Sequence, residues 1–126
     1  MPYQPFDIAL HEGELAETEF AQAIRLAFVE HKDDRMARKT GNVFIEYSQR
    51  TGPSGISTTA AQFWAMRYAE DCWFFMPTSL LRALATRAWN EGRRRPGGDF
   101  DNEGVLIPLE WLAKPWETAM RANEAA

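Results

Sequence analysis

The stretch "FVEHKDDRMARKTGNVFIEYSQR", residues 28–50, decides the predicted fold, because two short apolar runs flank a basic turn. The run over 43–49 is rich in β-branched and aromatic residues, which is typical of a strand, and the run over 26–33 also has strand periodicity. Gly41 and Asn42 between them tolerate the positive φ of a tight turn. The pattern therefore predicts two strands that pair as a hairpin.

This hairpin would bring two acidic residues together. Residues two apart in a strand share a face of the sheet, so the pairing predicts Asp34 near Glu46, with Lys32 beside them. Two neighbouring carboxylates repel each other unless a cation neutralises them, and oxygen ligands suit Mg²⁺ or Mn²⁺. A lysine alongside can assist a metal-bound water or stabilise charge on a phosphate. We therefore predict Asp34, Glu46 and Lys32 as catalytic residues.

Two alternatives stay open for the same residues. Charged residues that alternate with apolar ones also describe a hairpin whose polar face simply meets solvent. A bulge at the end of the first strand would exchange the faces of Asp33 and Asp34, which makes Asp33 a rival for the metal.

The rest of the chain mixes helices and strands. Composition and periodicity predict helices over 10–24, over 59–69 and from Thr78 or Ser79 to just before Gly92, and short strands in "CWFFMP" and "VLIPL". A turn of helix and a frayed tail should follow. The predicted class is α+β (α/β-like): a single small domain with a mixed β-sheet, in which a central hairpin is flanked by helices.

Composition limits the possible classes of protein. The 126 residues suit one domain, and no apolar run is long enough for a membrane span. The first residues lack the basic start and apolar core of a signal peptide. The single cysteine, Cys72, lies in an apolar run and is expected to be a buried thiol in a reducing cytoplasm.

The net charge of −4 argues against a general duplex binder, but the basic residues are clustered. A local basic surface is compatible with an acidic protein. The residues predicted to contact nucleic acid are Arg35, Arg38, Lys39, Arg50, Arg93, Arg94 and Arg95.

A resemblance rests on the order of four features: a helix with Gly13 and Glu17, then "VEHKDD", then "TGNVFIEYSQR", then "GPSGISTTAAQFW". In this order the chain resembles small phage-encoded or prophage-encoded proteins that are remotely related to the PD-(D/E)XK nuclease superfamily, in its Holliday-junction-resolvase-like branch. The resemblance covers about residues 10–112 and implies a restriction-endonuclease-like domain there. Residues 1–9 would form an N-terminal extension and residues 113–126 a C-terminal tail.

The resemblance implies a metal-dependent DNA endonuclease or resolvase-like enzyme, cytoplasmic and homodimeric, that acts on branched or nicked DNA. It assigns Glu17, Asp34 (or Asp33) and Glu46 as ligands of Mg²⁺ or Mn²⁺. The lysine of the family motif falls on Ser48, and Lys32 would substitute for it. The family core also usually has one more strand between the first helix and the aspartate than this chain has room for.

The alternative is a catalytically inactive protein with the same fold that binds or inhibits a host protein. The missing lysine and the net charge of −4 favour this alternative.

Overall fold

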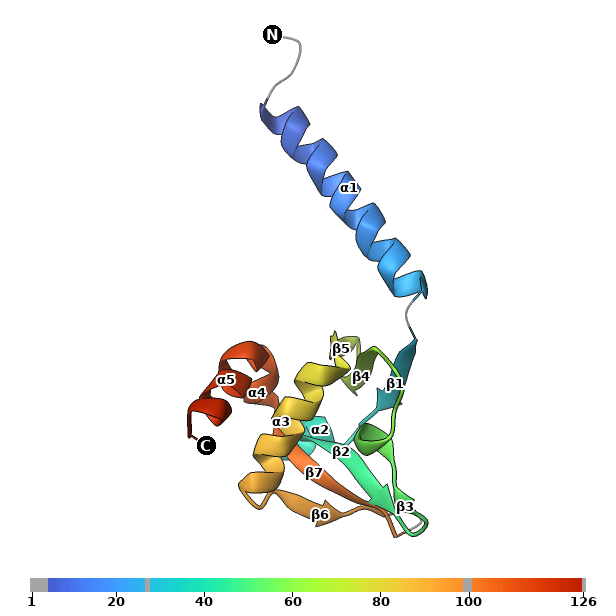
Figure 1. The fold of residues 1–126 in the computed structure, drawn as a ribbon, viewed down its shortest axis with the longest axis vertical. Coiled ribbons are helices and arrows are strands. Elements are labelled where there is room, and N and C mark those ends of the chain that lie inside the picture. Colours follow the sequence, from blue (N-terminus) through green and yellow to red (C-terminus); the bar gives the residue numbers. More distant parts are fainter. Residues whose placement is uncertain (1–4, 27, 99–100, 126) are drawn as a thin grey trace.

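The strands form two separate sheets that lie across from each other, with helices at their sides (Figure 1). This computed structural model describes residues 5–26, 28–98 and 101–125, and the side chains of residues 12–23, 28–98 and 101–120 within them. The chain is thus a small α+β domain, as predicted from the sequence.

The three-stranded sheet contains β1 (Val29–Asp33), β4 (Phe63–Ala69) and β5 (Cys72–Pro77), in the order β1-β4-β5. Strand β1 is parallel to β4, and β4 and β5 form an antiparallel hairpin.

The four-stranded sheet is antiparallel throughout and has the order β3-β2-β7-β6. Its strands are β2 (Asn42–Gln49), β3 (Gly52–Pro53), β6 (Arg94–Pro96) and β7 (Glu103–Pro108).

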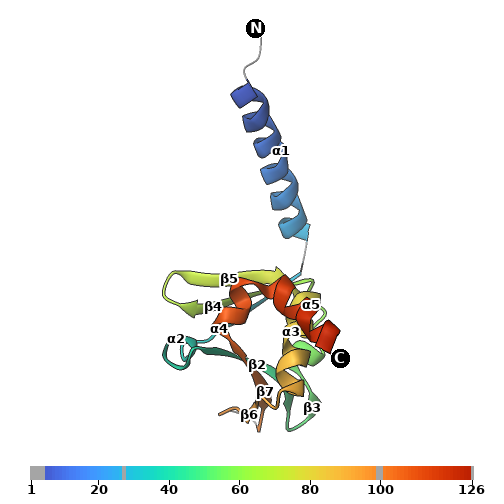
Figure 2. The ribbon, with the colours of Figure 1, turned by 90° about the vertical axis from the view of Figure 1, so that its left-hand side faces the viewer.

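Helix α3 (Thr78–Asn90) contacts strands of both sheets and fills the core with Leu80, Leu81 and Leu84 (Figure 2). Trp64 from the three-stranded sheet and Ile45 from the four-stranded sheet belong to the same apolar cluster. The remaining helical segments are α1 (Pro5–Leu26), α2 (Ala37–Thr40), η1 (Gly55–Ser57), α4 (Leu109–Ala113) and α5 (Pro115–Ala125).

The predicted hairpin of residues 28–50 is wrong. Strand β1 pairs with β4 in one sheet, whereas β2 pairs with β3 and β7 in the other. The connection between them contains α2 and carries the chain from one sheet to the other. The main partners of the two strands lie farther along the chain: β4 for β1 and β7 for β2.

The helix predicted over 59–69 is also wrong, since residues 63–69 form β4. Trp64 and Met66 point into the core, while Phe63 and Ala65 alternate with them and are only partly buried. This period of two is that of a strand between two neighbours. The hydroxyl of Thr59 accepts a hydrogen bond from the backbone N–H of Ala61 before the strand begins.

Three smaller expectations change as well. Helix α1 begins at Pro5 instead of residue 10. The segment expected to fray forms α5, which packs on α3 and buries Ala119. Cys72 is exposed rather than buried, because it follows the β4–β5 turn at the start of β5.

The strands "CWFFMP" and "VLIPL" and the helix that begins at Thr78 are confirmed. None of the helices in the described residues is both long and apolar enough to cross a membrane.

Candidate functional site

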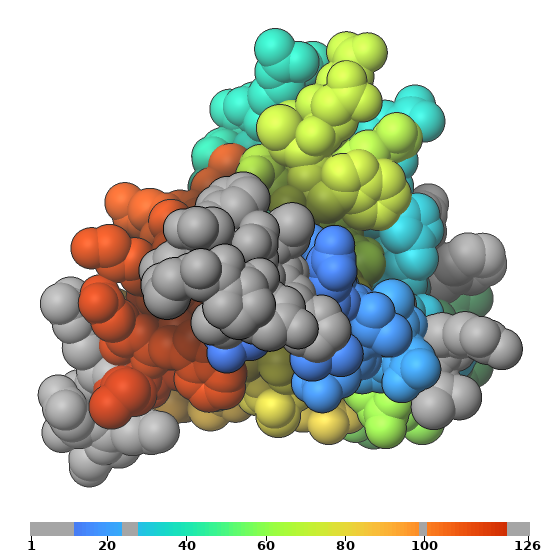
Figure 3. Space-filling view, turned by 90° about the horizontal axis from the view of Figure 1, so that it is seen from above, coloured from blue at the N-terminus to red at the C-terminus, as the bar shows by residue number. Residues whose placement is uncertain are grey.

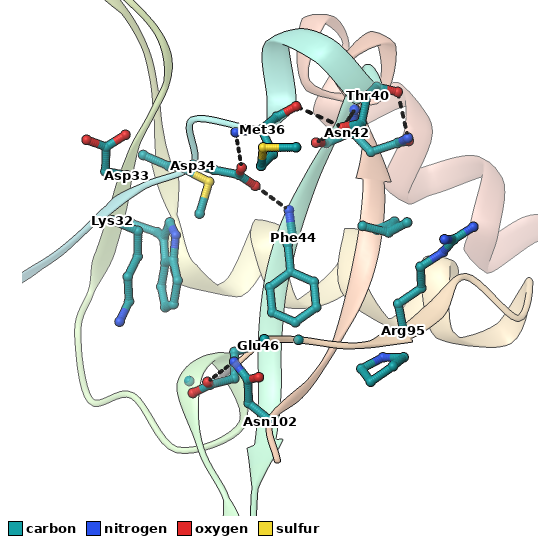
Figure 4. Close-up of a pocket in the computed structure, with 17 residues that line it drawn as sticks. Lys32, Asp33, Asp34, Met36, Thr40, Asn42, Phe44, Glu46, Arg95 and Asn102 are labelled. Atoms are coloured by element: carbon teal, nitrogen blue, oxygen red, sulfur yellow. Dashed lines mark hydrogen bonds between the residues drawn. The ribbon is translucent and has the colours of Figure 1, made fainter. Parts of the chain in front are cut away.

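A cavity of about 860 Å³ lies between the two sheets, and we call it the inter-sheet cavity (Figure 4). Strands β1 and β4 form one side, and strands β2, β6 and β7 form the other. Its lining includes three of the residues predicted to be catalytic, together with one of the predicted nucleic-acid contacts: Lys32, Asp34, Glu46 and Arg95. The structure thus brings these residues to one cavity by a different route from the predicted hairpin.

Asp34 follows directly on β1, and both of its carboxylate oxygens accept hydrogen bonds from the backbone. Oδ1 accepts from the N–H groups of Met36 (3.0 Å) and Ala37 (3.1 Å) at the start of α2. Oδ2 accepts from the N–H of Phe44 in β2 (2.7 Å). This one side chain therefore joins the end of the first sheet, the connecting helix and the second sheet.

At the other end of the cavity, both carboxylate oxygens of Glu46 also accept hydrogen bonds, in this case from side chains. Its Oε2 accepts from the hydroxyl of Ser54 (2.9 Å), and its Oε1 accepts from the side-chain amide of Asn102 (2.9 Å). Gly55, next to Ser54, has φ +55°, and a Cβ there would collide with the carbonyl oxygen of Glu46. The loop can approach Glu46 this closely only because residue 55 is glycine.

Phe44 separates the two acidic residues. It shares one face of β2 with Glu46, and its ring lies between the carboxylates of Asp34 and Glu46 (Figure 4). Phe44 is itself fixed by Gly104 on the neighbouring strand, where any side chain would overlap the ring.

Lys32 lies on the β1 side of the cavity. Its ammonium group is 3.2 Å from the carboxylate of Glu30 and 5.9 Å from the ring centre of Trp64. The ammonium group of Lys32 thus pairs with Glu30, which is not one of the predicted catalytic residues.

Asp33, the rival of Asp34 for the metal, also borders the cavity, but its carboxylate is paired with arginine side chains. Arg67 donates a hydrogen bond to its carboxylate (2.6 Å), and Arg35 is 4.0 Å away. The hydrogen bond from Arg67 lowers the pKa of Asp33, and the Coulombic attraction of Arg67 and Arg35 adds to this.

Glu17 does not join Asp34 and Glu46. It lies on α1, which extends away from the two sheets, and its side chain is exposed (Figures 1 and 2). Within the described part of the chain, no three His, Cys, Asp or Glu side chains are grouped so that they could hold a metal ion. Because Glu17 is remote and the ring of Phe44 lies between Asp34 and Glu46, the predicted set of three metal ligands is not assembled in this arrangement.

The predicted nucleic-acid contacts do not form one surface. Arg38 and Lys39 are exposed on α2, and Arg50 pairs with Asp101 (2.8 Å) at the far end of β2. Arg93 pairs with Glu91 (3.1 Å).

Arg93 is the first of three consecutive arginines, and the side chains of the other two lie in different surroundings. The guanidinium of Arg94 lies 4.2 Å from the ring centre of Trp89, and Arg95 lines the inter-sheet cavity. Consecutive strand residues point to opposite faces, which is why this run is divided.

Sequence reasoning missed three residues that surround the predicted acids: Phe44 and Asn102, which line the cavity, and Ser54, which donates to Glu46. The signal for Ser54 was present, because a serine followed by glycine marks a tight loop. No local pattern points to Asn102, which meets Glu46 from 56 positions away.

Comparison of the chain with protein-family models, with curated proteins and with solved structures gave no match.

Proposed function

We propose that the chain is a non-catalytic binding protein that receives a segment of a partner protein in the inter-sheet cavity. One observation carries this proposal: all four carboxylate oxygens of Asp34 and Glu46 accept hydrogen bonds from the chain itself. These hydrogen bonds tie both carboxylates to the walls of the cavity, and the ring of Phe44 lies between the two acidic groups.

The lining of the cavity suggests what it binds. Phe44 and Met36 offer apolar surface, and the charged side chains of the lining have both signs: Lys32, Arg95, Asp33, Asp34 and Glu46. The volume is in the range of about 300–1,000 Å³ that is usual for ligand sites. A peptide segment with an apolar side chain between polar ones would match this lining.

The partner would be a host or phage protein in the cytoplasm, as the resemblance of the sequence implies. The restriction-endonuclease-like arrangement and the phage origin stay predictions of that resemblance.

The test is affinity capture from the lysate of a host cell, with the tagged protein and two charge-reversed variants. Arg95→Glu changes the cavity, whereas Lys39→Glu changes an exposed site on α2 and serves as the matched control. We expect one protein to be retained by the wild type and by Lys39→Glu and lost with Arg95→Glu. Equal capture by all three proteins would place the binding surface outside the cavity.

A second candidate is a metal-dependent DNA endonuclease, which is favoured by the presence of Lys32, Asp34 and Glu46 in one cavity. Its test is cleavage of linear, nicked and branched DNA with Mg²⁺ or Mn²⁺. If the wild-type protein cleaves DNA and the Glu46→Gln variant does not, the chain is an endonuclease and the binding proposal is wrong. We expect no cleavage by either protein.

A further inference from the structure

Strand β1 lies at the edge of the three-stranded sheet, and among the described strands it pairs only with β4. In a parallel pair, alternate residues of a strand direct both their N–H and their C=O toward the partner strand. At the start of β1, the carbonyl of Phe28 accepts a hydrogen bond from the N–H of Phe63 (3.4 Å). At its end, the N–H of Asp34 donates to the carbonyl of Arg67 (2.8 Å). The even-numbered residues of 28–34 therefore face β4 with their backbone groups.

The odd-numbered residues between them, Val29, His31 and Asp33, direct their N–H and C=O to the free edge of β1. None of these backbone groups has a hydrogen-bond partner among the described residues. Seen from above, the cyan part of the chain that contains β1 lies beside the yellow-green β4–β5 hairpin, away from the orange-red C-terminal helices (Figure 3). Such an edge is a template on which another extended chain can add.

The inter-sheet cavity reaches this free edge. Lys32 and Asp33 both line the cavity, although their side chains leave β1 in opposite directions (Figure 4). Consecutive residues of a strand point to opposite faces of its sheet, so a cavity that touches both extends around an edge of the strand. The other edge of β1 is covered by β4. The unpaired backbone groups of β1 therefore border the cavity of about 860 Å³.

A second strand edge faces the cavity from the four-stranded sheet. The N–H of Phe44 in β2 points away from the neighbouring strand β7, since it donates to the carboxylate of Asp34 (2.7 Å). This carboxylate thus supplies the acceptor that the carbonyl of an adjacent strand would supply. The cavity lies between two strand edges, and the ligand that matches such edges is an extended polypeptide backbone.

The charged side chains of β1 have partners within the chain. Lys32 is 3.2 Å from Glu30, and Asp33 contacts Arg67 (2.6 Å) and Arg35 (4.0 Å). A segment that pairs with β1 therefore meets no unpaired charge there, and its recognition depends on backbone hydrogen bonds.

The space beside β1 suits a single segment better than a second folded copy. At one end the edges of β1 and β2 are spanned by the side chain of Asp34 alone. The edge of another folded sheet would bring its neighbouring strands with it, and these would overlap β2. A segment without a sheet of its own avoids this overlap.

We propose that the segment of the partner protein binds as a β-strand that pairs with the free edge of β1 through Val29, His31 and Asp33. This inference rests on the proposed binding function and specifies the partner segment: an extended stretch about as long as β1, which has five residues. Alternate side chains of the segment point into the cavity, where Phe44 offers apolar surface. Main-chain hydrogen bonds then give affinity, and the side chains in the cavity give specificity.

The first test uses a displayed library of random linear peptides, selected for binding to the full chain. The peptide that binds most tightly is synthesised with one backbone N-methyl group at each position in turn. Each N-methyl group removes one N–H and leaves the side chains unchanged. Affinity is measured for the wild-type protein and, with the unmodified peptide, for Arg95→Glu.

We expect N-methylation to weaken binding by about tenfold or more at every second position of the bound stretch, and to have little effect between these positions. Losses without this alternation, combined with a loss for Arg95→Glu, would overturn the strand pairing and leave the proposed function in place. Equal binding to Arg95→Glu and the wild type would overturn the proposed function, and the inference with it. Recovery of no binding peptide would overturn both.

The second test changes the edge of β1 itself. His31→Pro removes an N–H that points away from β4, a position at which an edge strand tolerates proline. His31→Ala is the matched control, because it keeps that N–H. We expect the selected peptide to bind His31→Ala like the wild type and His31→Pro about tenfold more weakly or worse. Equal binding to the two variants would overturn the proposal.

Circular dichroism shows whether His31→Pro is folded. If it is not, Val29→Pro with Val29→Ala as its control replaces the pair, since proline is also tolerated at the first residue of a strand.

Hydrogen exchange of the isolated protein tests whether a second copy occupies the edge instead. The N–H of His31 should exchange faster than those of Glu30 and Lys32, which face β4, at every protein concentration. Protection of the His31 N–H that grows with protein concentration would assign the edge to another copy of the chain and overturn the proposal.

Discussion

At the scale of single residues, Asp34 is the most informative side chain, because one carboxylate accepts three backbone hydrogen bonds from two elements. Removing a charged acceptor leaves its donors without a partner, which costs about 2–3 kcal/mol. We therefore predict that Asp34→Ala lowers the free energy of unfolding by about this amount. Urea denaturation without added metal measures the change.

Arg50→Ala is the control for Asp34→Ala, since it removes an exposed ion pair with Asp101 that is worth less than about 1 kcal/mol. If Asp34→Ala and Arg50→Ala have the same small effect, the hydrogen bonds of Asp34 do not support the fold.

Gly55 supplies a second prediction at this scale. Its φ of +55° and the nearness of the Glu46 carbonyl leave no room for a Cβ. A left-handed conformation alone costs an ordinary residue about 1–2 kcal/mol, so Gly55→Ala should destabilise the protein by at least about that much. Gly98→Ala is the control, because a Cβ there meets nothing within 4 Å. Equal melting temperatures for the two variants would contradict this description of the loop.

Asp33 gives a pH-dependent prediction. The hydrogen bond from Arg67 lowers its pKa below the ordinary value of 3.8, so the ionised carboxylate stabilises the folded state. This contribution is complete above about pH 4 and is lost as the pH falls through the lowered pKa. The melting temperature of wild type should exceed that of Asp33→Asn at pH 7, and the difference should shrink at pH 3. A difference that is the same at both values would contradict the assignment.

At the scale of elements, residues 59–69 show where sequence reasoning fails. Their aromatic and small residues suit a helix, but pairing with β1 and β5 makes residues 63–69 a strand. Propensity is a weak preference, and tertiary contacts override it. Helix α3 was predictable from its apolar spacing, although its N-cap is Pro77, which makes no side-chain capping hydrogen bond.

The strand assignment of β4 can be tested by substitution. In a strand, Trp64 and Met66 face the core together, so Trp64→Ala and Met66→Ala should each cost about 2–5 kcal/mol. Phe63→Ala, on the opposite face, should cost clearly less. Denaturation of the three variants measures this order. A loss for Phe63→Ala as large as that for Trp64→Ala would contradict the alternation.

At the scale of the whole molecule, the class of fold could be predicted, but the assignment of strands to sheets could not. The 28–50 stretch suggested a hairpin because its two strands are adjacent in the sequence. The actual partners of β1 and β2 begin at Phe63 and Glu103. No local pattern specifies which distant strand a segment will join.

The candidate site was predicted only in part, for the same reason. Lys32, Asp34 and Glu46 do line one cavity, since β1 and β2 face each other across it. Met36 and Ala37 donate locally to Asp34, but the other hydrogen bonds to the two carboxylates come from Phe44, Ser54 and Asn102, whose positions follow from the tertiary fold. The sequence could therefore show which residues approach one another but not what they do there.

The most direct test of the central claim is thermal unfolding of the wild-type protein during titration with Mn²⁺. If the carboxylates of Asp34 and Glu46 support the cavity and bind no metal, the melting temperature should stay constant. A saturable rise in the melting temperature that is absent in Glu46→Gln would show that the metal binds the folded protein through this residue, and would contradict the claim.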